Sequence, residues 1–231
     1  MMQMKLSVII PVYNEEKTLT TLLSKVKKNK FNKEIIIVND GSYDGTKEIL
    51  ENLKDRSPHI KVFHHKKNHG KGSAIRTGLT KTTGDIIIIQ DADLEYDPRD
   101  YKALILPMIK GKASVVYGTR LFSLTKKDMR TLHYLGNKFL TWITNILYRS
   151  KISDMETCYK VFKTDVIKSI NLRAKRFDFE PEITAKLLKK GYKIHEVPIN
   201  FKPRSFKEGK KITWKDGIKA VYYLLKYRFF D

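Results

Sequence analysis

The sequence predicts an α/β fold, in which one mostly parallel sheet is flanked by helices and followed by a basic helical region. Two features of the chain carry this prediction. Five apolar runs of strand length alternate with segments whose apolar residues recur at helical spacing. Most of these runs are continuously apolar, which is typical of parallel strands that are covered by helices on both faces.

The first half of the chain supplies the alternating elements. The predicted strands are the apolar runs, at residues 5–13, 34–40, 60–65, 84–93 and 113–120. The predicted helices lie between them, at residues 19–26, 44–54, 70–82 and 99–110. In sheets of this kind, ligands bind beyond the carboxyl ends of the strands. This rule brings three polar segments into one crevice, at residues 11–15, 39–42 and 91–95.

The regular alternation ends after Arg120. The elements predicted beyond it are a long amphipathic helix at 132–149, a helix at 180–191, a strand at 192–201 and a basic helix at 216–230. No linker separates the two parts of the chain. The sequence therefore predicts a single domain over residues 1–231, with one half at 1–118 and the other at 119–231.

The composition is strongly basic, with 46 Lys+Arg against 25 Asp+Glu and a formal net charge of +21. Such a charge indicates an anionic partner: a nucleic acid, a membrane surface or a phosphorylated substrate. The single cysteine, Cys158, excludes an internal disulfide framework. The sequence shows neither a signal-peptide core nor an apolar run of bilayer-spanning length. We therefore expect a cytoplasmic protein whose membrane contact, if any, is peripheral.

An acidic run stands out against this basic background. Asp91, Asp93, Glu95 and Asp97 occupy alternate positions directly after four isoleucines. Residues at alternate positions of an extended segment point to one face, so these carboxylates are predicted to crowd one another unless a cation lies between them. Mg²⁺ and Mn²⁺ prefer such oxygen ligands. A solvated turn is the alternative, and Asp97, before Pro98, is interpreted as a helix cap.

Five fragments in order carry a resemblance to a known family. They are "SVIIPVYNEEKTL", "IIIVNDGSYDGT", "NHGKGSAIRTGL", "GDIIIIQDADLEYDP" and "YGTR". This succession resembles the family 2 glycosyltransferases, and within them the dolichol- or polyprenyl-phosphate mannose and glucose synthases. A later stretch, "FDFEPEITAKLLKKGYKIHEVPINFKPRS", also resembles that group. The resemblance implies a Rossmann-like A-type glycosyltransferase fold. It also implies transfer of a hexose, mannose or glucose, from a GDP- or UDP-sugar to a polyprenyl or dolichyl phosphate, with inversion.

The resemblance assigns residues to the donor and to a divalent cation. It implies a nucleotide-sugar site in the half at 1–118, formed by Pro11, Tyr13, Asn14, Glu15, Val38, Asp40, Lys71, Gly72, Asp91, Ala92 and Asp93. Asp91, Asp93 and Glu95 are implied to hold Mg²⁺ or Mn²⁺. From spacing alone, Asn14 and Glu15 could simply begin a helix, and Asp40 could form a turn instead of binding a base.

The half at 119–231 is implied to receive the acceptor. Arginine forms paired hydrogen bonds with phosphate. The resemblance places Arg120 and Arg204, with Lys210, around the acceptor phosphate, so the residues expected to act in the reaction are Asp91, Asp93, Arg120 and Arg204. Glu182 is expected to have a structural or acceptor-ordering role.

Two helices leave a choice between core and membrane. In the C-terminal helix, the expected core contacts are Ile218, Val221, Tyr222, Leu225 and Phe229. In the alternative, an aromatic set meets an anionic bilayer beside Lys219, Lys226 and Arg228, namely Trp214, Tyr223, Tyr227 and Phe230. The helix at 132–149 carries a stripe that could form core, a partner interface or a lipid groove, namely Leu135, Phe139, Trp142, Ile143 and Ile146.

Three other functions remain open from the sequence. A family 2 enzyme could use a glycan or protein acceptor, and a nucleotidyltransferase would also use strand-end carboxylates. A nucleic-acid-binding protein would explain the net charge, but the strand-end acids would repel phosphate and no nucleic-acid-binding motif is present, so no nucleic acid is expected. A separate membrane-anchoring subunit is also left open.

Overall fold

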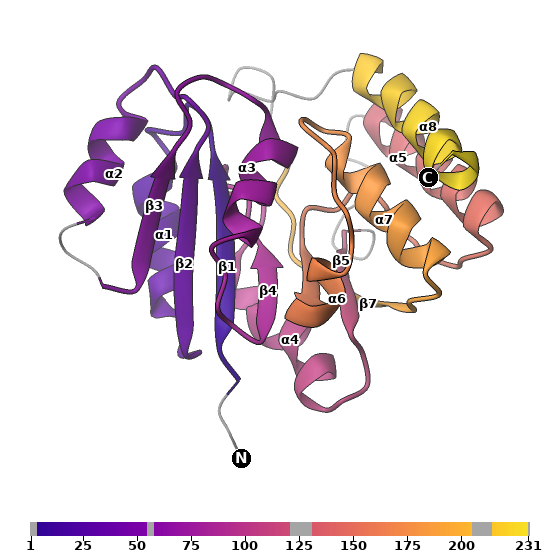
Figure 1. Cartoon of the computed structure of the whole chain (residues 1–231), viewed down its shortest axis with the longest axis horizontal. Coiled ribbons are helices and arrows are strands. Elements are labelled where there is room, and N and C mark those ends of the chain that lie inside the picture. The colour runs from indigo at the N-terminus through magenta and orange to yellow at the C-terminus, as the bar shows by residue number, and fades with distance from the viewer. Residues whose placement is uncertain (1–3, 55–57, 121–130, 205–213, 231) are drawn as a thin grey trace.

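One seven-stranded sheet forms the centre of the molecule (Figure 1). The computed structural model describes residues 4–54, 58–120, 131–204 and 214–230. The strands are β1 (Leu6–Val12), β2 (Lys33–Asn39), β3 (Ile60–His64), β4 (Ile86–Ile89), β5 (Val115–Thr119), β6 (Lys160–Lys163) and β7 (Ile194–Pro198). Their order is β3-β2-β1-β4-β6-β5-β7, and only β6 runs against the others in this sheet. The predicted α/β class with a mostly parallel sheet is confirmed.

The parallel half follows from its isoleucine-rich strands. In the register, Ile9 of β1 lies between Ile36 of β2 and Ile89 of β4, and all three are fully or almost fully buried. Figure 1 shows α3 in front of this half of the sheet and α1 behind it. The helices of this half are α1 (Leu19–Lys28), α2 (Thr46–Lys54), α3 (Lys71–Leu79) and α4 (Tyr101–Ile109). Covering both faces explains why β1, β2 and β4 carry runs of consecutive apolar residues.

The antiparallel strand β6 and the short helix α6 (Thr164–Lys168) were not among the predicted elements. The reason is visible in the sequence of β6, "KVFK", which has only two apolar residues between lysines. Lys160 is nevertheless completely buried, and its ammonium donates to the backbone carbonyls of Met155 and Thr157. Backbone partners supplied by the tertiary fold therefore hold a charged residue in a strand that periodicity does not indicate.

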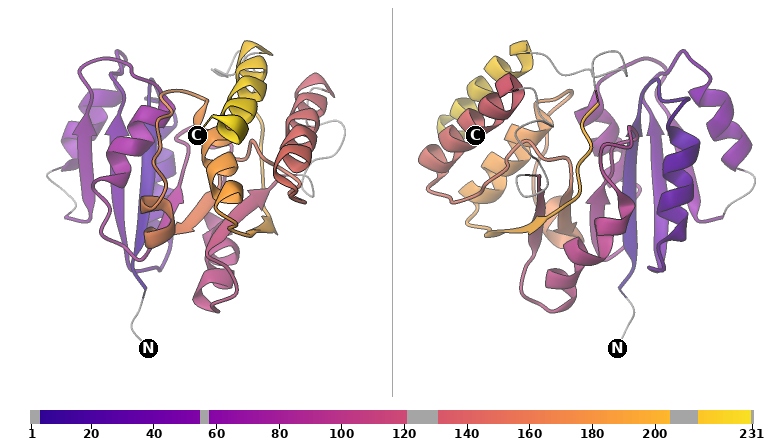
Figure 2. Two further views of the ribbon diagram at one scale, coloured as in Figure 1. Left: turned by 45° about the vertical axis from the view of Figure 1, so that its right-hand side comes forward. Right: turned by 180° about the vertical axis from the view of Figure 1, so that it is seen from behind.

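A second layer of helices covers the other end of the molecule (Figure 2). It consists of α5 (Thr131–Tyr148), α7 (Phe179–Lys189) and α8 (Trp214–Phe229). Both views in Figure 2 show α5 and α8 side by side. A separate apolar cluster joins the three helices, with Leu140 of α5, Ala185 of α7 and Leu224 of α8 among its buried members. These three helices stand where the sequence predicts them, within one to three residues at each end.

The outward faces of α5 and α8 are apolar. On α8 the residues in the core are Ala220, Leu224 and Tyr227, whereas four predicted core contacts are exposed, namely Ile218, Tyr222, Leu225 and Phe229. The prediction that these four dock onto the core is therefore wrong, and only Val221 is partly buried there. On α5 the exposed stripe is Leu135, Phe139, Trp142 and Ile146, while Ile143 packs inward. No helix among the described residues is long and apolar enough to span a bilayer.

Candidate active site

The segments that follow β1, β2 and β4 come together at the carboxyl ends of these strands. The segment after β1 is tied to the segment after β2 by backbone and side-chain contacts. The Asn14 amide donates to Ser42 Oγ at 2.9 Å, and the Tyr43 amide donates to Asn14 Oδ1 at 3.0 Å. Asn14 has a φ of 53°, in the left-handed region that asparagine tolerates. The amide of Glu15 donates to Thr46 Oγ1 at 2.9 Å, so both residues also organise the turn itself.

Arg204 gathers three acidic residues from two of these strand ends. Its guanidinium contacts both carboxylate oxygens of Glu15 at 3.2 Å and the Oδ2 atom of Asp93 at 3.1 Å. Its backbone amide donates to Glu95 Oε1 at 2.7 Å. The structure thus brings together four predicted site residues that lie as much as 189 positions apart in the chain.

A second cation lies on the neighbouring carboxylate. The Lys71 ammonium is 2.9 Å from Asp91 Oδ1 and 2.8 Å from Glu180 Oε1. Burial would lower the pKa of Lys71, but the charge of Asp91 beside it raises that pKa well above its usual value. Lys71 therefore remains an ammonium, and it links the end of β4 to the first turn of α7.

The two carboxylates of the D-x-D pair differ in their electrostatics. Burial favours the neutral form of Asp91, yet the Lys71 charge holds the pKa of Asp91 below its ordinary value. Burial, together with the charges of Asp91 and Glu95, raises the pKa of Asp93 to about 7, although Arg204 opposes the shift. The positive charge near Asp93 does not balance the negative charges of its neighbours. A cation bound beside Asp93 would therefore be favoured.

These residues fit a divalent cation in part. Carboxylate oxygens are the ligands that Mg²⁺ and Mn²⁺ prefer, commonly one or two of them with substrate phosphates and water. Asp91 and Asp93 meet this description. One carboxylate oxygen of Glu95 accepts the Arg204 amide, and among the described residues no three acidic, histidine or cysteine side chains form a metal-binding group as they stand. The ligand set of Asp91, Asp93 and Glu95 therefore stays a prediction.

Arg120 is held beside the site by a buried acid. Its Nε and Nη2 atoms each lie 2.7 Å from the carboxylate of Asp154, and Asn137 donates to the same carboxylate at 2.8 Å. The guanidinium also lies 5.1 Å from the centre of the Phe201 ring. Asp154 therefore orients Arg120, whose role toward an acceptor phosphate stays a prediction. Lys210 lies outside the described residues.

Asp40 holds a loop. Its carboxylate accepts the amides of His69 at 2.9 Å and Gly70 at 2.6 Å, and it hydrogen-bonds with the His65 ring at 2.7 Å. This geometry supports the turn-forming interpretation of Asp40, while contact with a base remains a prediction.

The glycines of the same loop allow close packing. A Cβ at Gly72 would lie 2.9 Å from backbone atoms of Ala174, and one at Gly70 would lie 2.4 Å from the Lys175 carbonyl oxygen. The Gly72 amide donates to the Arg176 carbonyl at 3.1 Å, and the Ser73 amide to the Lys175 carbonyl at 2.9 Å. The first turn of α3 is thus capped by protein, so in this structure Gly72 serves packing rather than ligand contact.

The other residues predicted to bind the nucleotide sugar differ in their exposure to solvent. Tyr13 is half-buried with its ring edge-on to the exposed Tyr43, and Pro11 is also half-buried. Val38 and Ala92 are buried; Val38 belongs to a small apolar cluster with Ile36 and Ala74, so only its backbone is available to a ligand. Their contacts with nucleotide stay predictions.

The sequence did not indicate a role for Glu180, and the glutamate named in this segment was Glu182. Glu182 accepts the amides of Arg173 at 2.8 Å and Ala174 at 2.5 Å and pairs with Lys186, which is the structural role that was expected. Glu180, two positions earlier, is the acid that contacts Lys71. The available signal was the spacing in "FEPE", where Glu180 precedes Glu182 in the first turn of a helix.

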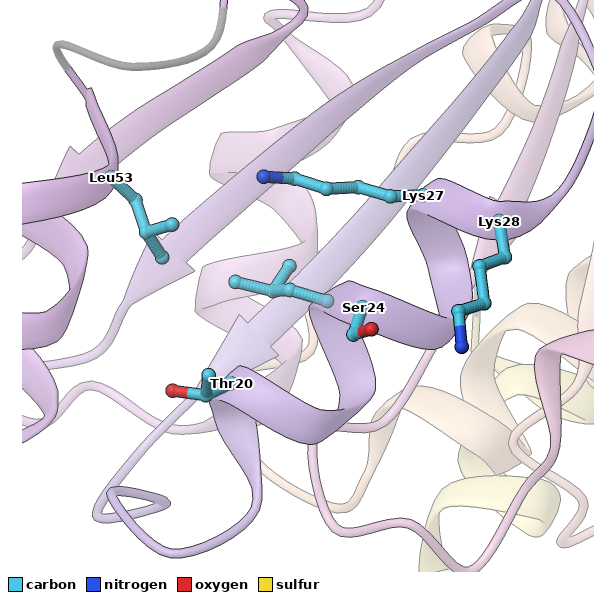
Figure 3. Close-up of a pocket in the computed structure, with 6 residues that line it drawn as sticks. Thr20, Ser24, Lys27, Lys28 and Leu53 are labelled. Carbon is cyan, nitrogen blue, oxygen red and sulfur yellow. The ribbon is translucent and has the colours of Figure 1, made fainter.

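A separate hollow lies between α1 and α2 (Figure 3). It has a volume of about 480 Å³ and is lined by apolar, hydroxyl and lysine side chains, among them Thr20, Lys27 and Leu53. None of the predicted site residues lines it, and its lining contains no carboxylate. The cluster of carboxylates and cations at the strand ends is therefore the better candidate for an active site.

Comparisons with known proteins show what this chain is similar to. The family model described as "Glycosyl transferase family 2" matches residues 7–170. A dolichyl-phosphate beta-glucosyltransferase of Trichomonas vaginalis is 31% identical over 97% of this chain and 73% of its own length. A UDP-N-acetylglucosamine–dolichyl-phosphate N-acetylglucosaminyltransferase of Methanococcus voltae is 29% identical over 94% of this chain and 93% of its own length.

Solved structures show the same fold. The glucosyl-3-phosphoglycerate synthase of Mycobacterium tuberculosis, solved with Mn²⁺, uridine diphosphate and phosphoglyceric acid, superposes with a TM-score of 0.76. The match covers 99% of this chain and 80% of that one, at 17% sequence identity. At this identity the likeness concerns the arrangement of the backbone, which agrees with the fold that the motifs predict.

Proposed function

Because the chain belongs to glycosyl transferase family 2, we propose that it transfers a hexose from a UDP- or GDP-sugar to the phosphate of a polyprenyl or dolichyl lipid. The names of two relatives support this pair of substrates. Both names state a dolichyl phosphate, and one states a UDP-linked sugar. Glycosyl transfer is the reaction class of the family; the acceptor, the donor base and the hexose are the parts that need a test.

The observation that carries the proposal is the pairing of two strand-end carboxylates with two cations. Asp91 contacts Lys71, and Asp93 contacts Arg204. A nucleotide diphosphate bound with a divalent cation matches this arrangement, because the carboxylates suit the cation while the ammonium and guanidinium suit phosphate oxygens. Buried carboxylates at the centre of a nucleic-acid-binding surface would repel the phosphates of the nucleic acid.

The proposed reaction does not need a strong general base. A lipid phosphate is already ionised near neutral pH, and Arg120 and Arg204 are proposed to position it. Its oxygen attacks the anomeric carbon from the face opposite the nucleotide, the bond from that carbon to the diphosphate oxygen breaks, and the configuration inverts. Mg²⁺ or Mn²⁺ held by Asp91 and Asp93 would neutralise charge on the departing diphosphate.

The lipid acceptor implies contact with a membrane, and the exposed faces of α5 and α8 suit it. Phe139, Trp142 and Ile146 of α5 and Leu225 and Phe229 of α8 are each more than two-fifths exposed. Basic residues accompany them, including the exposed Lys138, Arg149, Lys219 and Arg228. Apolar side chains with neighbouring cations are typical of proteins that lie on an anionic leaflet. The protein is proposed to act as a peripheral enzyme at the cytoplasmic leaflet, with the donor bound by residues 1–118 and the acceptor by residues 119–231.

A product assay tests the reaction. Purified protein is incubated with UDP- and GDP-sugars, with or without a short-chain polyprenyl phosphate, in Mn²⁺, Mg²⁺ or a chelator, and products are identified by mass spectrometry. We expect a glycosyl phospholipid that forms only with metal. The control variant is Asp165→Asn, which removes an exposed carboxylate of α6 far along the chain from the site motifs.

The outcomes separate the alternatives. Release of pyrophosphate from a nucleoside triphosphate would indicate a nucleotidyltransferase and overturn the proposal. Hydrolysis or binding of a nucleotide sugar without a lipid product, in the presence of vesicles, would redirect the acceptor to a glycan or a protein. Lipid product that appears only after adding a membrane extract would indicate that a separate anchoring subunit is needed.

A further inference from the structure

A basic cavity lies between α8 and the segment that precedes α7. Its volume is about 420 Å³. Five of its lining residues are cationic, namely Arg173, Lys175, Arg176, Lys219 and Lys226, and two are acidic, Asp178 and Asp216. The lining thus carries three more positive than negative charges, which favours an anionic occupant.

Two of these cations contact the fold through neutral groups, since Arg176 donates to Asn68 Oδ1 at 3.3 Å and the Lys226 ammonium lies over the rings of Tyr223 and Tyr227. None of the five forms an ion pair with a carboxylate of the described residues, although such pairs hold Lys71, Arg120 and Arg204 at the active site. Asp178 is occupied by its own loop, because it accepts the Arg176 amide at 2.6 Å and also the Lys175 amide. Hydrogen bonds from backbone amides in the cavity wall therefore partly compensate the negative charge of Asp178.

The cavity borders the apolar face of α8. Successive residues of a helix are turned by about 100°, so Lys219 and Lys226 lie on the face next to that of Ile218 and Leu225. Lys219 is exposed, and the Lys226 ammonium lies 5.8 Å from the centre of the Tyr223 ring, whose residue also lines the cavity. A ligand with an anionic head and an apolar tail could occupy the cavity with its head while its tail continues along the exposed face.

The cavity is separate from the site of sugar transfer. The segment at 173–176 stands between them, because its carbonyl oxygens at Lys175 and Arg176 accept the first amides of α3, the helix that carries Lys71. The cavity opens on the other side of this segment, toward α8. Its cations are therefore not part of the Asp91 and Asp93 site.

We propose that this cavity binds the phosphate head group of a membrane lipid and thereby fixes how the protein lies on the bilayer. The inference rests on the proposed membrane contact of α5 and α8, and it adds a defined phosphate site to that contact. Guanidinium and ammonium groups supply charged hydrogen bonds to phosphate oxygens. An anionic phospholipid and the polyprenyl phosphate both carry such a head group, and the vesicle experiment distinguishes these two sources.

The test compares two triple variants of equal net charge. Arg176→Ala/Lys219→Ala/Lys226→Ala removes cavity cations, whereas Lys47→Ala/Lys110→Ala/Lys112→Ala removes exposed lysines on α2 and after α4. Binding is measured by co-sedimentation with three kinds of vesicle: phosphatidylcholine alone, with phosphatidylglycerol, and with dolichyl phosphate. Melting temperatures check that both variants are folded.

We expect the cavity variant to bind the phosphate-bearing vesicles at least tenfold more weakly than the control variant, since each cation near an anionic surface contributes roughly a fivefold change in affinity. Equal loss with phosphatidylglycerol and dolichyl phosphate assigns the cavity to anionic phospholipid; loss confined to dolichyl phosphate assigns it to the acceptor. Equal binding by the two variants overturns the inference. Vesicle binding needs no nucleotide sugar, so a negative result in the product assay leaves this test intact.

Discussion

Asp91 and Asp93 are chemically alike and lie two positions apart, yet their surroundings separate them. The Lys71 ammonium keeps Asp91 ionised, whereas burial and neighbouring charge raise the pKa of Asp93 to about 7. A cation that enters between them satisfies Asp93 most, because that carboxylate has the larger deficit of positive charge. The pair is therefore suited to holding a cation that arrives with its substrate.

The first prediction at the scale of residues concerns Asp91. We expect Asp91→Asn to lower metal-dependent turnover by about two orders of magnitude or more while the protein stays folded, because a ligand to the charge-neutralising cation is lost. Turnover at a series of Mn²⁺ concentrations measures the effect, and the melting temperature reports the fold. Turnover equal to that of the Asp165→Asn control would contradict the role of Asp91.

A second residue, Glu34, lies away from the site and tests stability. It is buried next to Ser7, Lys61 and Thr83. Burial would raise its pKa, but the hydrogen bonds from these three residues together lower it to about 2. Because the folded-state pKa lies below the ordinary value of 4.5, the stabilisation by Glu34 is complete above that pH and is lost as the pH falls toward 2.

We therefore expect Glu34→Gln to lower the free energy of unfolding at pH 7 by about 1–3 kcal/mol, with a smaller difference at pH 3. Urea denaturation at several pH values measures this dependence. Glu48→Gln, an exposed position in the first turn of α2, serves as the control. If the difference in the free energy of unfolding stayed constant from pH 7 to pH 3, ionisation of Glu34 would not contribute to stability.

The parallel-sheet rule places Glu15, Asp91 and Asp93 at neighbouring strand ends, and Glu15 and Asp93 do meet there, through Arg204, which the resemblance and not the rule had indicated. Their partners could not be predicted. Lys71 bridges Asp91 to Glu180, and that contact depends on how α7 approaches the sheet. Nothing local in "FEPE" distinguishes an acid that faces the site from one that caps a backbone turn.

At the scale of elements, the contact between α3 and the segment before α7 sets the position of Lys71. The amides of Gly72 and Ser73 donate to carbonyl oxygens of Arg176 and Lys175, and no side chain fits at Gly72. The start of α3 is thereby fixed against a segment about one hundred residues later. Of the glycines in this loop, only Gly72 was predicted to lie in the nucleotide-sugar site; that role stays a prediction, and the close packing gives a second reason for a glycine there.

Gly72→Ala tests this contact. The added Cβ would lie 2.9 Å from the carbonyl carbon and oxygen of Ala174, so we expect a loss of stability of about 1–3 kcal/mol. Gly136→Ala in α5 is the matched control, since nothing lies within 4 Å of its Cβ. Removing a helical glycine there is expected to stabilise by about 0.5–1 kcal/mol. Chemical denaturation of both variants measures the two opposite signs, and equal changes would contradict the packing argument.

The elements that periodicity predicted are those with long or continuous apolar patterns. β6 has four residues and a buried lysine, and it pairs antiparallel to both neighbours, so its place is specified by the tertiary fold. On α8 the apolar spacing was detected correctly, but spacing alone does not say which apolar stripe faces the core. The stripe of Ala220, Leu224 and Tyr227 packs inward, and Ile218, Tyr222, Leu225 and Phe229 remain outside.

At the scale of the whole molecule, the apolar outer faces of α5 and α8 lie at the opposite end from β3 (Figures 1 and 2). The net charge of +21 attracts the protein to any anionic surface, and these faces would decide which side meets it. If the protein binds membranes as proposed, electrostatic attraction and apolar contact would make separable contributions to that binding.

Removing the apolar contact tests this division. We expect Phe139→Ser/Trp142→Ser/Leu225→Ser to weaken binding to anionic vesicles by roughly tenfold per side chain, with the remaining binding abolished by salt. Leu106→Ser/Ile109→Ser, on the exposed side of α4, is the control. Vesicle co-sedimentation at low and high salt measures the effect. Equal binding by both variants would assign α5 and α8 to another partner.

The contact between Arg204 and Glu15 also bears on how the protein is made. Glu15 and Asp93 leave the ribosome early, and the guanidinium that neutralises them follows 189 positions after Glu15. A nascent chain whose first four strands have already paired would therefore expose a cluster of acids without its cation. Since domains generally fold as units during synthesis, this part of the candidate site is expected to be completed only after residue 204 has been translated.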